Sequence, residues 1–482
     1  MASSINKQSI GQFEGHGDVG QISRPGYCDY DAADQAYTIA PGVNLRGSQD
    51  GFHFVRKRIR GNFILTMRAE FFEDWGNPHR KMGWMARSGL EDNSIFVSSS
   101  VHGDGRSVMR FRREAGGPTE EMQANVAKAD VIQLERKDNS YITSAARFGD
   151  PFEAVRASQI DLGEEIYIGL FVCTDVNEPI EQAIFRDVRI VRPVKEDFER
   201  GRDPFSSLLE ILNVASGHRQ IVYRSEQVIE APNWTRDGKA LIFNRDGRLY
   251  RFEMATGTVT LIDTGEVAGN NNDHVLSFDG SRLAISSHGA TDGLSRVYTV
   301  PVQGGKPKLV TLKGPSYLHG WSPDGKLLVY TGQRNGQYDI YRIPIEGGEE
   351  EQLTNTPGLE DGPEYMPDGR YIYFNSVRTG GMQIWRMRPD GSGQEQLTDD
   401  KYNNWFPHIS PDGKWVVFIS YLAGEVAPSD HPAAKRVYLR VMPLDGGTPK
   451  VLAYLYGGQG TMNVPSWSPD GSRLAFVSNT VP

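Results

Sequence analysis

Short apolar stretches alternate with turn residues along the C-terminal half of the chain. Six Asp-Gly pairs each follow such a stretch, at Asp237, Asp279, Asp324, Asp368, Asp412 and Asp470. Successive Asp residues in this set lie 42, 45, 44, 44 and 58 residues apart. A second apolar stretch, such as residues 327–330 or 415–418, follows each turn. A period of roughly 40–45 residues built from strands and turns predicts a β-propeller with one four-stranded blade per repeat.

The pattern also predicts how the ring closes. The last repeat ends two strands after Asp470, and two strands of matching pattern precede the first repeat: residues 208–222 resemble residues 249–262. We expect residues 206–223 to complete the sixth blade, because a closed ring leaves no exposed strand edge. The sequence therefore predicts a six-bladed propeller.

The N-terminal part has a different pattern, in which apolar and polar residues alternate with period two. This alternation covers residues 61–71, 81–87, 107–112, 131–136, 141–147, 166–172 and 183–190. Many strands with few helical stretches favour a β-sandwich. We therefore expect an all-β protein with a sandwich over residues 1–195, a charged linker over 196–205 and the propeller over 206–482.

Several repeat motifs resemble those of known propellers. They include Trp321-Ser-Pro-Asp-Gly, the strand ends Gln352-Leu-Thr and Gln396-Leu-Thr, and the link Asn375-Ser-Val-Arg-Thr-Gly. These motifs are similar to those of TolB-type propellers, and also occur in prolyl-oligopeptidase-like and tricorn-type proteases. The resemblance covers about residues 205–482 and implies the fold rather than the activity, because this fold hosts unrelated functions.

The N-terminal strands resemble a concanavalin A/laminin G-like jelly roll. The resemblance rests on Gly83-Trp-Met-Ala-Arg, Leu134-Glu-Arg-Lys-Asp and the closing hairpin within residues 169–190. It implies contact with carbohydrate. Loop residues that we expect to be available for such contact are Trp75, His79, Arg80, His102 and Asp104, whereas Trp84 is expected in the core.

Composition narrows the classes of partner. The chain has 61 acidic and 52 basic residues and a net charge of −9, without a Lys/Arg block, so no nucleic-acid partner is expected. No apolar run approaches the ~20 residues of a membrane span. The start of the sequence lacks a secretory signal; the domain content nevertheless favours an extracytoplasmic (periplasmic or secreted) protein, with a cytoplasmic one as the alternative. Whether Cys28 and Cys173 pair is left open.

Motifs exclude two kinds of chemistry. The chain has no Gly-x-Ser-x-Gly elbow, so we expect no serine peptidase. It also has no phosphate-binding loop and no dinucleotide fingerprint, so no nucleotide cofactor is expected. Any chemistry must then come from the blades.

The start of each innermost strand is the place to search, since these six segments converge on the propeller axis. Five residues before each turn Asp stand Pro232, His274, His319, Pro363, Pro407 and Pro465. Histidine thus replaces proline on two adjacent blades, and His408 lies one place later on a third. Three imidazoles predict a divalent metal (Mn, Zn or Ca) held by His274, His319 and His408. The arrangement resembles that of oligogalacturonate lyases, which hold manganese with blade histidines. The alternative is a hydrated channel in which these side chains bond to water and backbone.

Other polar residues near the axis differ from blade to blade, as expected for a site that is shaped to one ligand. The predicted catalytic residues are His319, His274, Glu364 and Asp361. The predicted substrate-binding residues are Glu230, Tyr317, Trp405, Asn404 and His431, the last from an insertion over residues 421–435. Long loops on rigid scaffolds often carry binding residues.

Three functions are compatible with these residues. The first is a carbohydrate-active protein that binds an oligosaccharide at the axial mouth and cleaves it by hydrolysis or β-elimination. The second is a non-catalytic glycan-binding module, and the third is a TolB-like protein-interaction scaffold of the cell envelope. Histidines at positions that other blades give to proline favour the first.

Overall fold

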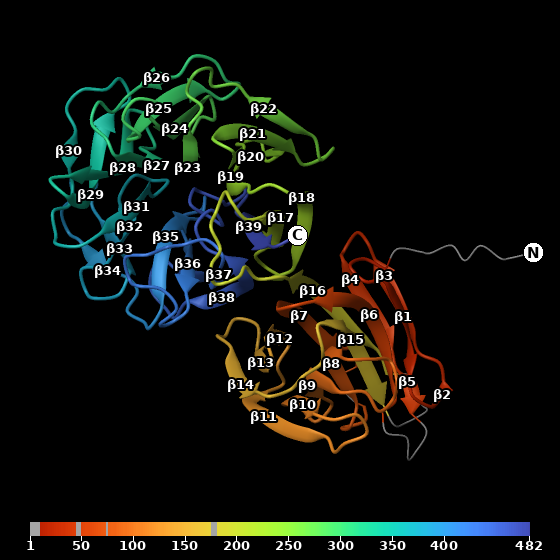
Figure 1. The fold of residues 1–482 in the computed structure, drawn as a ribbon. Helices are drawn as coiled ribbons and strands as arrows, with labels where there is room; N and C mark the ends of the chain where they lie inside the picture. Colours follow the sequence, from red (N-terminus) through yellow and green to blue (C-terminus); the bar gives the residue numbers. More distant parts are fainter. Residues whose placement is uncertain (1–9, 45–49, 74–75, 175–180) are drawn as a thin grey trace, which may run out of the picture. The chain divides into compact units, whose positions relative to one another are not determined.

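The computed structural model describes residues 10–44, 50–73, 76–174 and 181–482 and divides the chain into two compact units, Met1–Pro193 and Val194–Pro482. The described residues form strands and turns without a helix, so the protein is all-β. None of the described elements is a helix long and apolar enough to cross a membrane. The two units are drawn in Figure 1.

The first unit contains two sheets. The nine-stranded sheet has the order β1-β6-β15-β8-β9-β10-β11, with β5 on β15 and β2 on β5. Its strands are β1 (Gly15–Val19), β2 (Ile22–Arg24), β5 (Gly42–Asn44), β6 (Phe52–Arg60), β8 (Lys81–Arg87), β9 (Phe96–His102), β10 (Arg106–Arg112), β11 (Glu120–Ala127) and β15 (Glu165–Thr174). The seven-stranded sheet has the order β14-β13-β12-β7-β16-β4-β3. Its strands are β3 (Tyr27–Asp31), β4 (Ala36–Ala40), β7 (Phe63–Phe71), β12 (Val131–Lys137), β13 (Ser140–Ala146), β14 (Glu153–Ala157) and β16 (Ala183–Val191).

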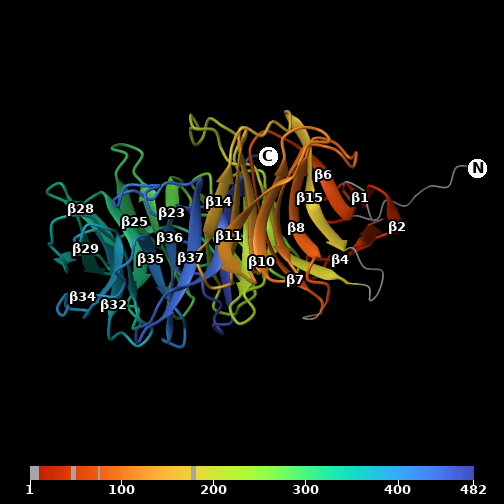
Figure 2. The same ribbon diagram turned by 90° about the horizontal axis from the view of Figure 1, so that it is seen from below.

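Both sheets contribute to one hydrophobic core. Val55 and Trp84 come from the first sheet, Leu65 and Leu134 from the second, and all four belong to one cluster of buried side chains. Alternating residues on many of the strands point into this core, which is why the period-two pattern located them. Figure 2 shows the strands of this unit in a second view. Cys28, in β3, is a free thiol, so it forms no disulfide with Cys173. The likeness to a concanavalin A jelly roll stays a prediction.

The second unit is a six-bladed propeller. Five four-stranded sheets follow one another around the ring in Figure 1. The first three are β19 (Glu230–Trp234), β20 (Ala240–Arg245), β21 (Arg248–Glu253) and β22 (Val259–Ile262); β23 (Asn270–Leu276), β24 (Arg282–His288), β25 (Ser295–Pro301) and β26 (Lys308–Leu309); and β27 (Ser316–Trp321), β28 (Leu327–Arg334), β29 (Gln337–Pro344) and β30 (Glu351–Gln352). The next two are β31 (Glu360–Tyr365), β32 (Ile372–Ser376), β33 (Gln383–Met387) and β34 (Glu395–Gln396); and β35 (Asn403–Ile409), β36 (Trp415–Tyr421), β37 (Lys435–Pro443) and β38 (Lys450–Gly457).

The sixth blade joins the two ends of the propeller sequence. β17 (Ser206–Asn213) pairs antiparallel with β39 (Arg473–Thr480) and with β18 (Arg219–Ser225). The predicted pairing of residues 206–223 with the segment after Asp470 is therefore confirmed. The innermost strand of this blade is reduced to one bridge, Trp467 to Leu474.

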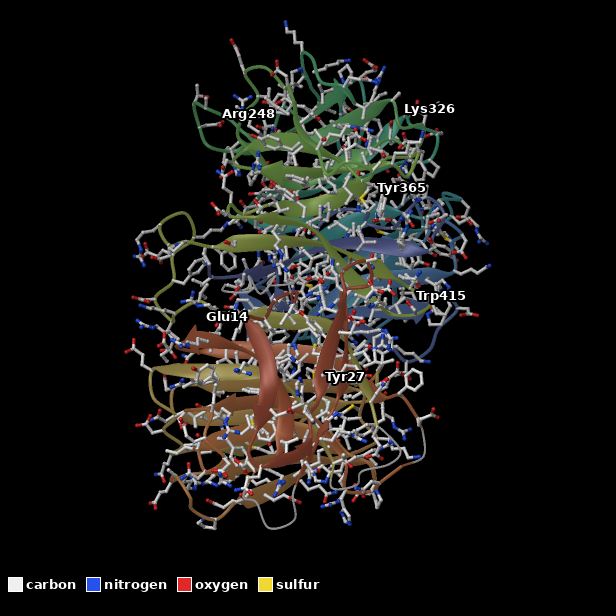
Figure 3. The ribbon with its side chains drawn as sticks, turned by 90° about the vertical axis from the view of Figure 1, so that its right-hand side faces the viewer. Glu14, Tyr27, Arg248, Lys326, Tyr365 and Trp415 are labelled. Atoms are coloured by element: carbon white, nitrogen blue, oxygen red, sulfur yellow. The ribbon has the colours of Figure 1, made fainter. Side chains whose placement is uncertain are left out.

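The Asp-Gly turns hold the repeat together by local hydrogen bonds. In blade three, Ser322 Oγ donates to Asp324 Oδ1 at 2.6 Å, and Lys326 N donates to the same oxygen at 3.1 Å. Gly325 has a φ of +70°, a conformation that glycine adopts without steric cost. Lys326 and Trp415, which each follow such a turn, are exposed, as Figure 3 shows. The turns end the innermost strands, and the opposite ends of these strands contribute residues to a cavity near the axis.

Candidate functional site

The innermost strands of the first five blades share a β-bulge. The ladder register shifts between Glu230 and Asn233 and at the equivalent places in β31 and β35, and at nearby places in β23 and β27. Ala231 and Phe406, at two of these bulges, have a φ of 55° although neither is glycine. A bulge re-aims the neighbouring side chains, and strained backbone of this kind is often found at functional sites. The bulges thus decide which residues face the axis.

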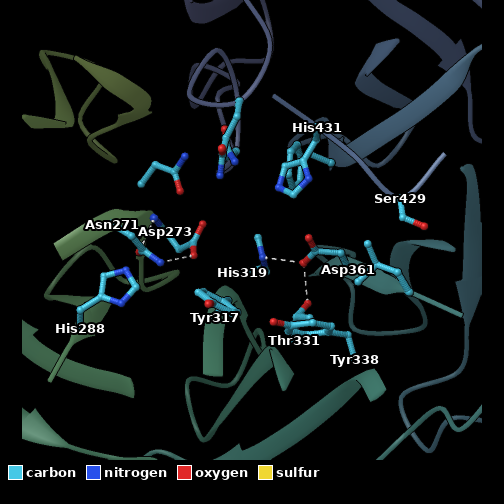
Figure 4. A pocket seen from close by; sticks show the side chains of 15 residues that line it. Asn271, Asp273, His288, Tyr317, His319, Thr331, Tyr338, Asp361, Ser429 and His431 are labelled. Carbon is cyan, nitrogen blue, oxygen red and sulfur yellow. Dashed lines mark hydrogen bonds and ion pairs between the residues drawn. The ribbon is translucent and has the colours of Figure 1, made fainter. Parts of the chain in front are cut away.

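These strands surround a cavity of ≈ 390 Å³ near the axis (Figure 4). Blades two to six contribute to its wall: Asn271, Asn272, Asp273, His288, Tyr317, His319, Thr331, Tyr338, Leu359, Asp361, Phe406, Ser429, His431, Gln459 and Asn463. Four predicted site residues, Tyr317, His319, Asp361 and His431, thereby meet around one space. The wall combines carboxyl groups, imidazoles, amides and aromatic rings.

A buried ion pair crosses the cavity wall between blades three and four. His319 Nε2 lies 3.1 Å from Asp361 Oδ1, which also accepts hydrogen bonds from Thr331 Oγ1 at 2.7 Å and Gly362 N at 2.8 Å. Burial alone raises the pKa of Asp361, but the hydrogen bond and charge of His319 outweigh burial and lower the pKa to about 2. Burial lowers the pKa of His319, and the two carboxyl groups around it more than compensate, so its pKa is raised. Each of the two groups therefore favours the charged form of the other.

Asp273 is the second carboxyl group of the cavity and behaves in the opposite way. Its side chain is buried, with only 4% of the residue exposed, and Oδ2 accepts a hydrogen bond from Asn271 Nδ2 at 2.9 Å. Burial raises the pKa of Asp273 to about 7, against the lowering effect of His319. Figure 4 shows His319 between Asp273 and Asp361. Two carboxyl groups with separated pKa values are the usual arrangement of a general acid beside an ionised partner.

The insertion in blade five supplies a third titratable group. His431 lines the cavity and stacks on Trp405, with ring centroids 4.3 Å apart. Burial lowers the pKa of His431, so its imidazole is neutral at physiological pH. Tyr421 Oη donates to Pro432 O at 2.8 Å and fixes the loop next to this histidine. The insertion over residues 421–435 thus contributes Ser429 and His431 to the cavity wall.

Aromatic and amide side chains complete the wall. Tyr317 and Tyr338 lie side by side with ring centroids 6.5 Å apart, and Phe406 stacks on His319 at 5.9 Å. Burial raises the pKa of Tyr317 to about 12, so its hydroxyl keeps its proton. Aromatic faces beside hydrogen-bonding groups are suited to a ligand that has both apolar and polar surfaces.

Three of the predicted residues have partners away from the cavity. His274 is fully buried, and its Nε2 lies 3.2 Å from Ile242 O. His408 Nδ1 lies 2.6 Å from Glu364 Oε2, and His408 Nε2 lies 3.2 Å from Met462 O. His274, His319 and His408 therefore do not converge on one point. Among the residues that the structure describes, no group of three or more His, Cys, Asp or Glu is arranged to hold a metal ion. A divalent metal stays a prediction.

Two predicted substrate-binding residues lie behind the cavity wall. Asn404 is fully buried inside blade five, where Nδ2 donates to Gln383 Oε1 at 3.0 Å and Oδ1 accepts from Ser420 Oγ at 2.7 Å. Trp405 is also fully buried and supports His431 from behind. The prediction of direct ligand contact is corrected for both, because the strand pleat turns Asn404 into the blade and the ring of His431 covers Trp405.

Sequence reasoning left Asp273, Phe406 and Asn463 out of the predicted site. They stand six, six and seven residues before their turn Asp, a region from which the prediction took Glu230, Tyr317, Asp361 and Trp405 but not these three. The bulge adds a residue to each strand and shifts the axis-facing positions away from the turn. Taking the residues at positions six and seven from every blade, rather than from some, would have included them.

Most of the first unit's candidate residues for sugar contact are buried or form ion pairs within the unit. Arg80 is buried, and its Nη1 lies 3.5 Å from Glu181 Oε1. His102 is buried at the end of β9, and Asp104 pairs with Arg106 Nε at 2.8 Å. His79 is exposed, and Trp75 lies outside the described residues. Trp84 is fully buried, as predicted. Contact of this unit with sugar stays a prediction.

Comparisons with known proteins agree with the propeller. Residues 319–437 match the family model described as the TolB beta propeller domain. The solved structure of a TolB candidate from Agrobacterium tumefaciens is 48% identical, covers 57% of this chain and 98% of its own, and superposes with a TM-score of 0.55. The Tol-Pal system protein TolB of Bordetella pertussis is 27% identical over 29% of this chain and 33% of its own length. The fold and the repeat thus define a protein with a TolB-type propeller.

A curated relative has the same identity. The uncharacterized protein Atu1656 of Agrobacterium fabrum is 48% identical over 272 residues, which are 56% of this chain and 92% of the relative. The chain belongs to the same family as Atu1656.

Proposed function

We propose that the axial cavity binds an oligosaccharide and cleaves it by acid–base chemistry. The observation that carries this proposal is the pair of carboxyl groups, Asp273 with a pKa of about 7 and Asp361 with a pKa of about 2, on the two sides of His319. A fold that only captured a partner would not require carboxyl groups of such different acidity. Perturbed pKa values in a cavity are a marker of catalytic groups.

The roles follow from the protonation states at neutral pH. Asp273, with a pKa of about 7, still carries its proton in a substantial share of molecules at neutral pH and can donate it to the leaving oxygen as the glycosidic bond breaks. The neutral imidazole of His431 can accept a proton from the attacking water, or from carbon in a β-elimination. The ion pair of His319 and Asp361 supplies fixed charges beside the reacting atoms, where preorganised electrostatics lowers the barrier.

The wall supports a carbohydrate as the ligand. Tyr317, Tyr338 and Phe406 offer aromatic faces for the apolar side of a sugar ring, and Asn271 and Asn463 lie on the wall as amide donors and acceptors. The cavity of ≈ 390 Å³ falls in the range of small-molecule sites. A concanavalin A-like sandwich in the first unit would aid glycan contact, and an extracytoplasmic location fits such a ligand.

A second candidate is a scaffold that captures a protein segment at the axial mouth. It is favoured by the match of residues 319–437 to the TolB beta propeller domain and by the similarity to the Tol-Pal system protein TolB. A non-catalytic glycan-binding module is the corresponding candidate for a sugar ligand. In both, Asp273 would have no effect beyond binding.

Turnover separates these candidates. The full chain is incubated with a panel of oligosaccharides, and new reducing ends or new unsaturated products are measured beside binding by calorimetry. In Asp273→Asn, binding should persist while turnover falls by roughly 10²–10⁴, the usual contribution of a general acid. Asp445→Asn, at an exposed turn of blade five, should behave as wild type. Binding without turnover in the wild type would favour a binding module, and the absence of any glycan binding would refute the proposal.

A further inference from the structure

Among the described residues that line the axial cavity there is no lysine and no arginine. Besides two tyrosines, the ionisable side chains of the wall are two aspartates and three histidines: Asp273, Asp361, His288, His319 and His431. Figure 4 shows them around the open space. A ligand in this cavity therefore meets a cationic side chain only where one of the histidines is protonated.

His319 is favoured in its charged form by the carboxyl groups around it, and the protein itself uses this charge. Its Nε2 lies 3.1 Å from Asp361 Oδ1, and the backbone of Asn463 accepts a further hydrogen bond from the ring. Phe406 stacks on the imidazole with ring centroids 5.9 Å apart, and only 4% of His319 is exposed. The positive charge of His319 is therefore matched by Asp361 inside the protein.

The other two histidines do not supply a buried cation. Burial lowers the pKa of His431, whose ring stacks on Trp405. His288 is exposed at the end of β24, where its Nδ1 lies 3.0 Å from Gly293 O, so water and salt screen its charge whenever it is protonated. The buried part of the wall thus has one matched pair of charges, together with Asp273, which adds negative charge when it ionises.

Two further carboxyl groups predicted for the site do not belong to the lining and have partners inside the protein. Glu230 Oε2 lies 2.6 Å from Arg200 Nη2, and Glu364 Oε2 lies 2.6 Å from His408 Nδ1. Arg200 and His408 are also absent from the lining. Neither of these basic side chains is therefore placed to receive an acidic group of a ligand in the cavity.

We infer that the cavity takes a neutral oligosaccharide and discriminates against uronic acids, the sugars in which C6 is oxidised to a carboxyl group. A uronate carboxylate would lie among Asp361 and Asp273 without a cationic side chain to pair with, and an unpaired charge is costly to bury. The hydroxyl groups of a neutral sugar need only hydrogen-bonding partners, which Asn272, Ser429 and Gln459 on the wall provide. This inference rests on the proposed function and names its class of substrate.

The inference also selects one of the two reactions. In β-elimination a carboxyl group stabilises the carbanion that forms beside it, and a neutral sugar has no such group. In hydrolysis the oxygen of water bonds to the anomeric carbon while the bond from this carbon to the glycosidic oxygen breaks. The proton of Asp273 goes to the leaving oxygen and a proton of the water goes to His431. One water molecule is consumed, and Asp273 and His431 return to their starting states by proton exchange with solvent.

The test uses three pairs of trisaccharides that differ only at C6: the trimers of glucose, galactose and mannose, and the trimers of the corresponding uronic acids. Binding to the full chain is measured by calorimetry at pH 7 and low salt. Each measurement is repeated with added manganese, because a divalent cation could pair with a carboxylate. In at least one pair the neutral trimer should bind, and at least ~10-fold more tightly than its uronic partner.

A cation placed in the wall should weaken this discrimination. Leu359 lines the cavity and is partly exposed, so Leu359→Lys adds a positive charge without removing a polar group. This variant should bind the uronic trimer of that pair ~10-fold or more tightly than wild type does. Leu359→Met is the matched control, because it changes the shape of the side chain without adding charge, and it should keep the wild-type ratio of affinities.

Three results would overturn the inference and leave the proposed function standing. They are a uronic trimer that binds wild type as tightly as its neutral partner with or without manganese, new unsaturated products from a uronic trimer, and a folded Leu359→Lys that gains no affinity for the uronic trimer. If Leu359→Lys does not fold, the wild-type pairs decide alone. Failure of all the trimers to bind would overturn the inference and count against the proposed function as well.

Discussion

Asp273→Asn gives a quantitative test of the cavity's electrostatics that does not depend on knowing the ligand. The substitution keeps the shape of the side chain, and its amide oxygen can still accept the hydrogen bond from Asn271 Nδ2. The substitution replaces a buried carboxyl group, which ionises when the pH rises, by an amide that stays uncharged. The variant therefore isolates the free-energy cost of ionising Asp273.

The magnitude follows from the pKa difference. The native carboxyl group keeps its proton to about pH 7, whereas in the unfolded chain it is released near the ordinary value of 3.8. Between these two values the unfolded state loses its proton first, so wild-type stability falls as the pH rises through this window. At ~1.4 kcal/mol per pH unit the loss is on the order of 4 kcal/mol above pH 7. The Asn variant should be spared this loss.

The assay is calorimetric unfolding of the full chain at pH 4.5 and pH 8, following the transition of the propeller unit. At roughly 2–4 °C per kcal/mol for a domain of this size, the variant should melt on the order of 10 °C above wild type at pH 8 and near it at pH 4.5. Asp430→Asn removes an exposed carboxyl group from the same insertion as His431 and should follow wild type. If Asp273→Asn is no more stable than wild type at pH 8, Asp273 is ionised without cost and its assignment as the general acid is wrong.

Three further predictions concern the cavity wall and the closure of the ring. His319→Ala removes the partner of Asp361 and should lower the free energy of unfolding by about 3–5 kcal/mol at pH 7. The double variant His319→Ala/Asp361→Asn should recover most of this loss, because no unpaired carboxylate stays buried. Denaturant unfolding at neutral pH measures both variants, and an equal loss in the double variant would contradict the ion pair. His408→Ala should lower stability by breaking the contact with Glu364 yet leave ligand affinity unchanged, and a calorimetric loss of binding would place His408 in the site after all. Leu209→Ala, in the closing strand β17, truncates a fully buried side chain and should lower the free energy of unfolding by about 2–5 kcal/mol. A negligible change in the unfolding transition of the propeller would show that β17 does not stabilise the closed ring.

The sequence by itself determined the fold of this protein to a large extent. Each Asp-Gly turn is stabilised by hydrogen bonds within a few residues, as between Ser322 and Asp324, so the turn appears in the sequence wherever it forms in space. The same holds for the alternation of the strands, because side-chain direction in a strand depends only on position. The matching patterns of residues 208–222 and 249–262 also sufficed to predict the closing blade. An unpaired edge strand leaves backbone N–H and C=O groups without partners, so pairing the two ends of the propeller sequence is favoured.

The site was decided by the tertiary structure. His274 and His319 stand at the same repeat position, yet one is sealed against Ile242 and the other faces the cavity, because the bulges differ between β23 and β27. The raised pKa of Asp273 requires burial together with the charges of His319, Asp361 and Glu230, which come from three other blades. Contacts between residues far apart in the chain leave no periodic signal, so only the folded ring could bring them together.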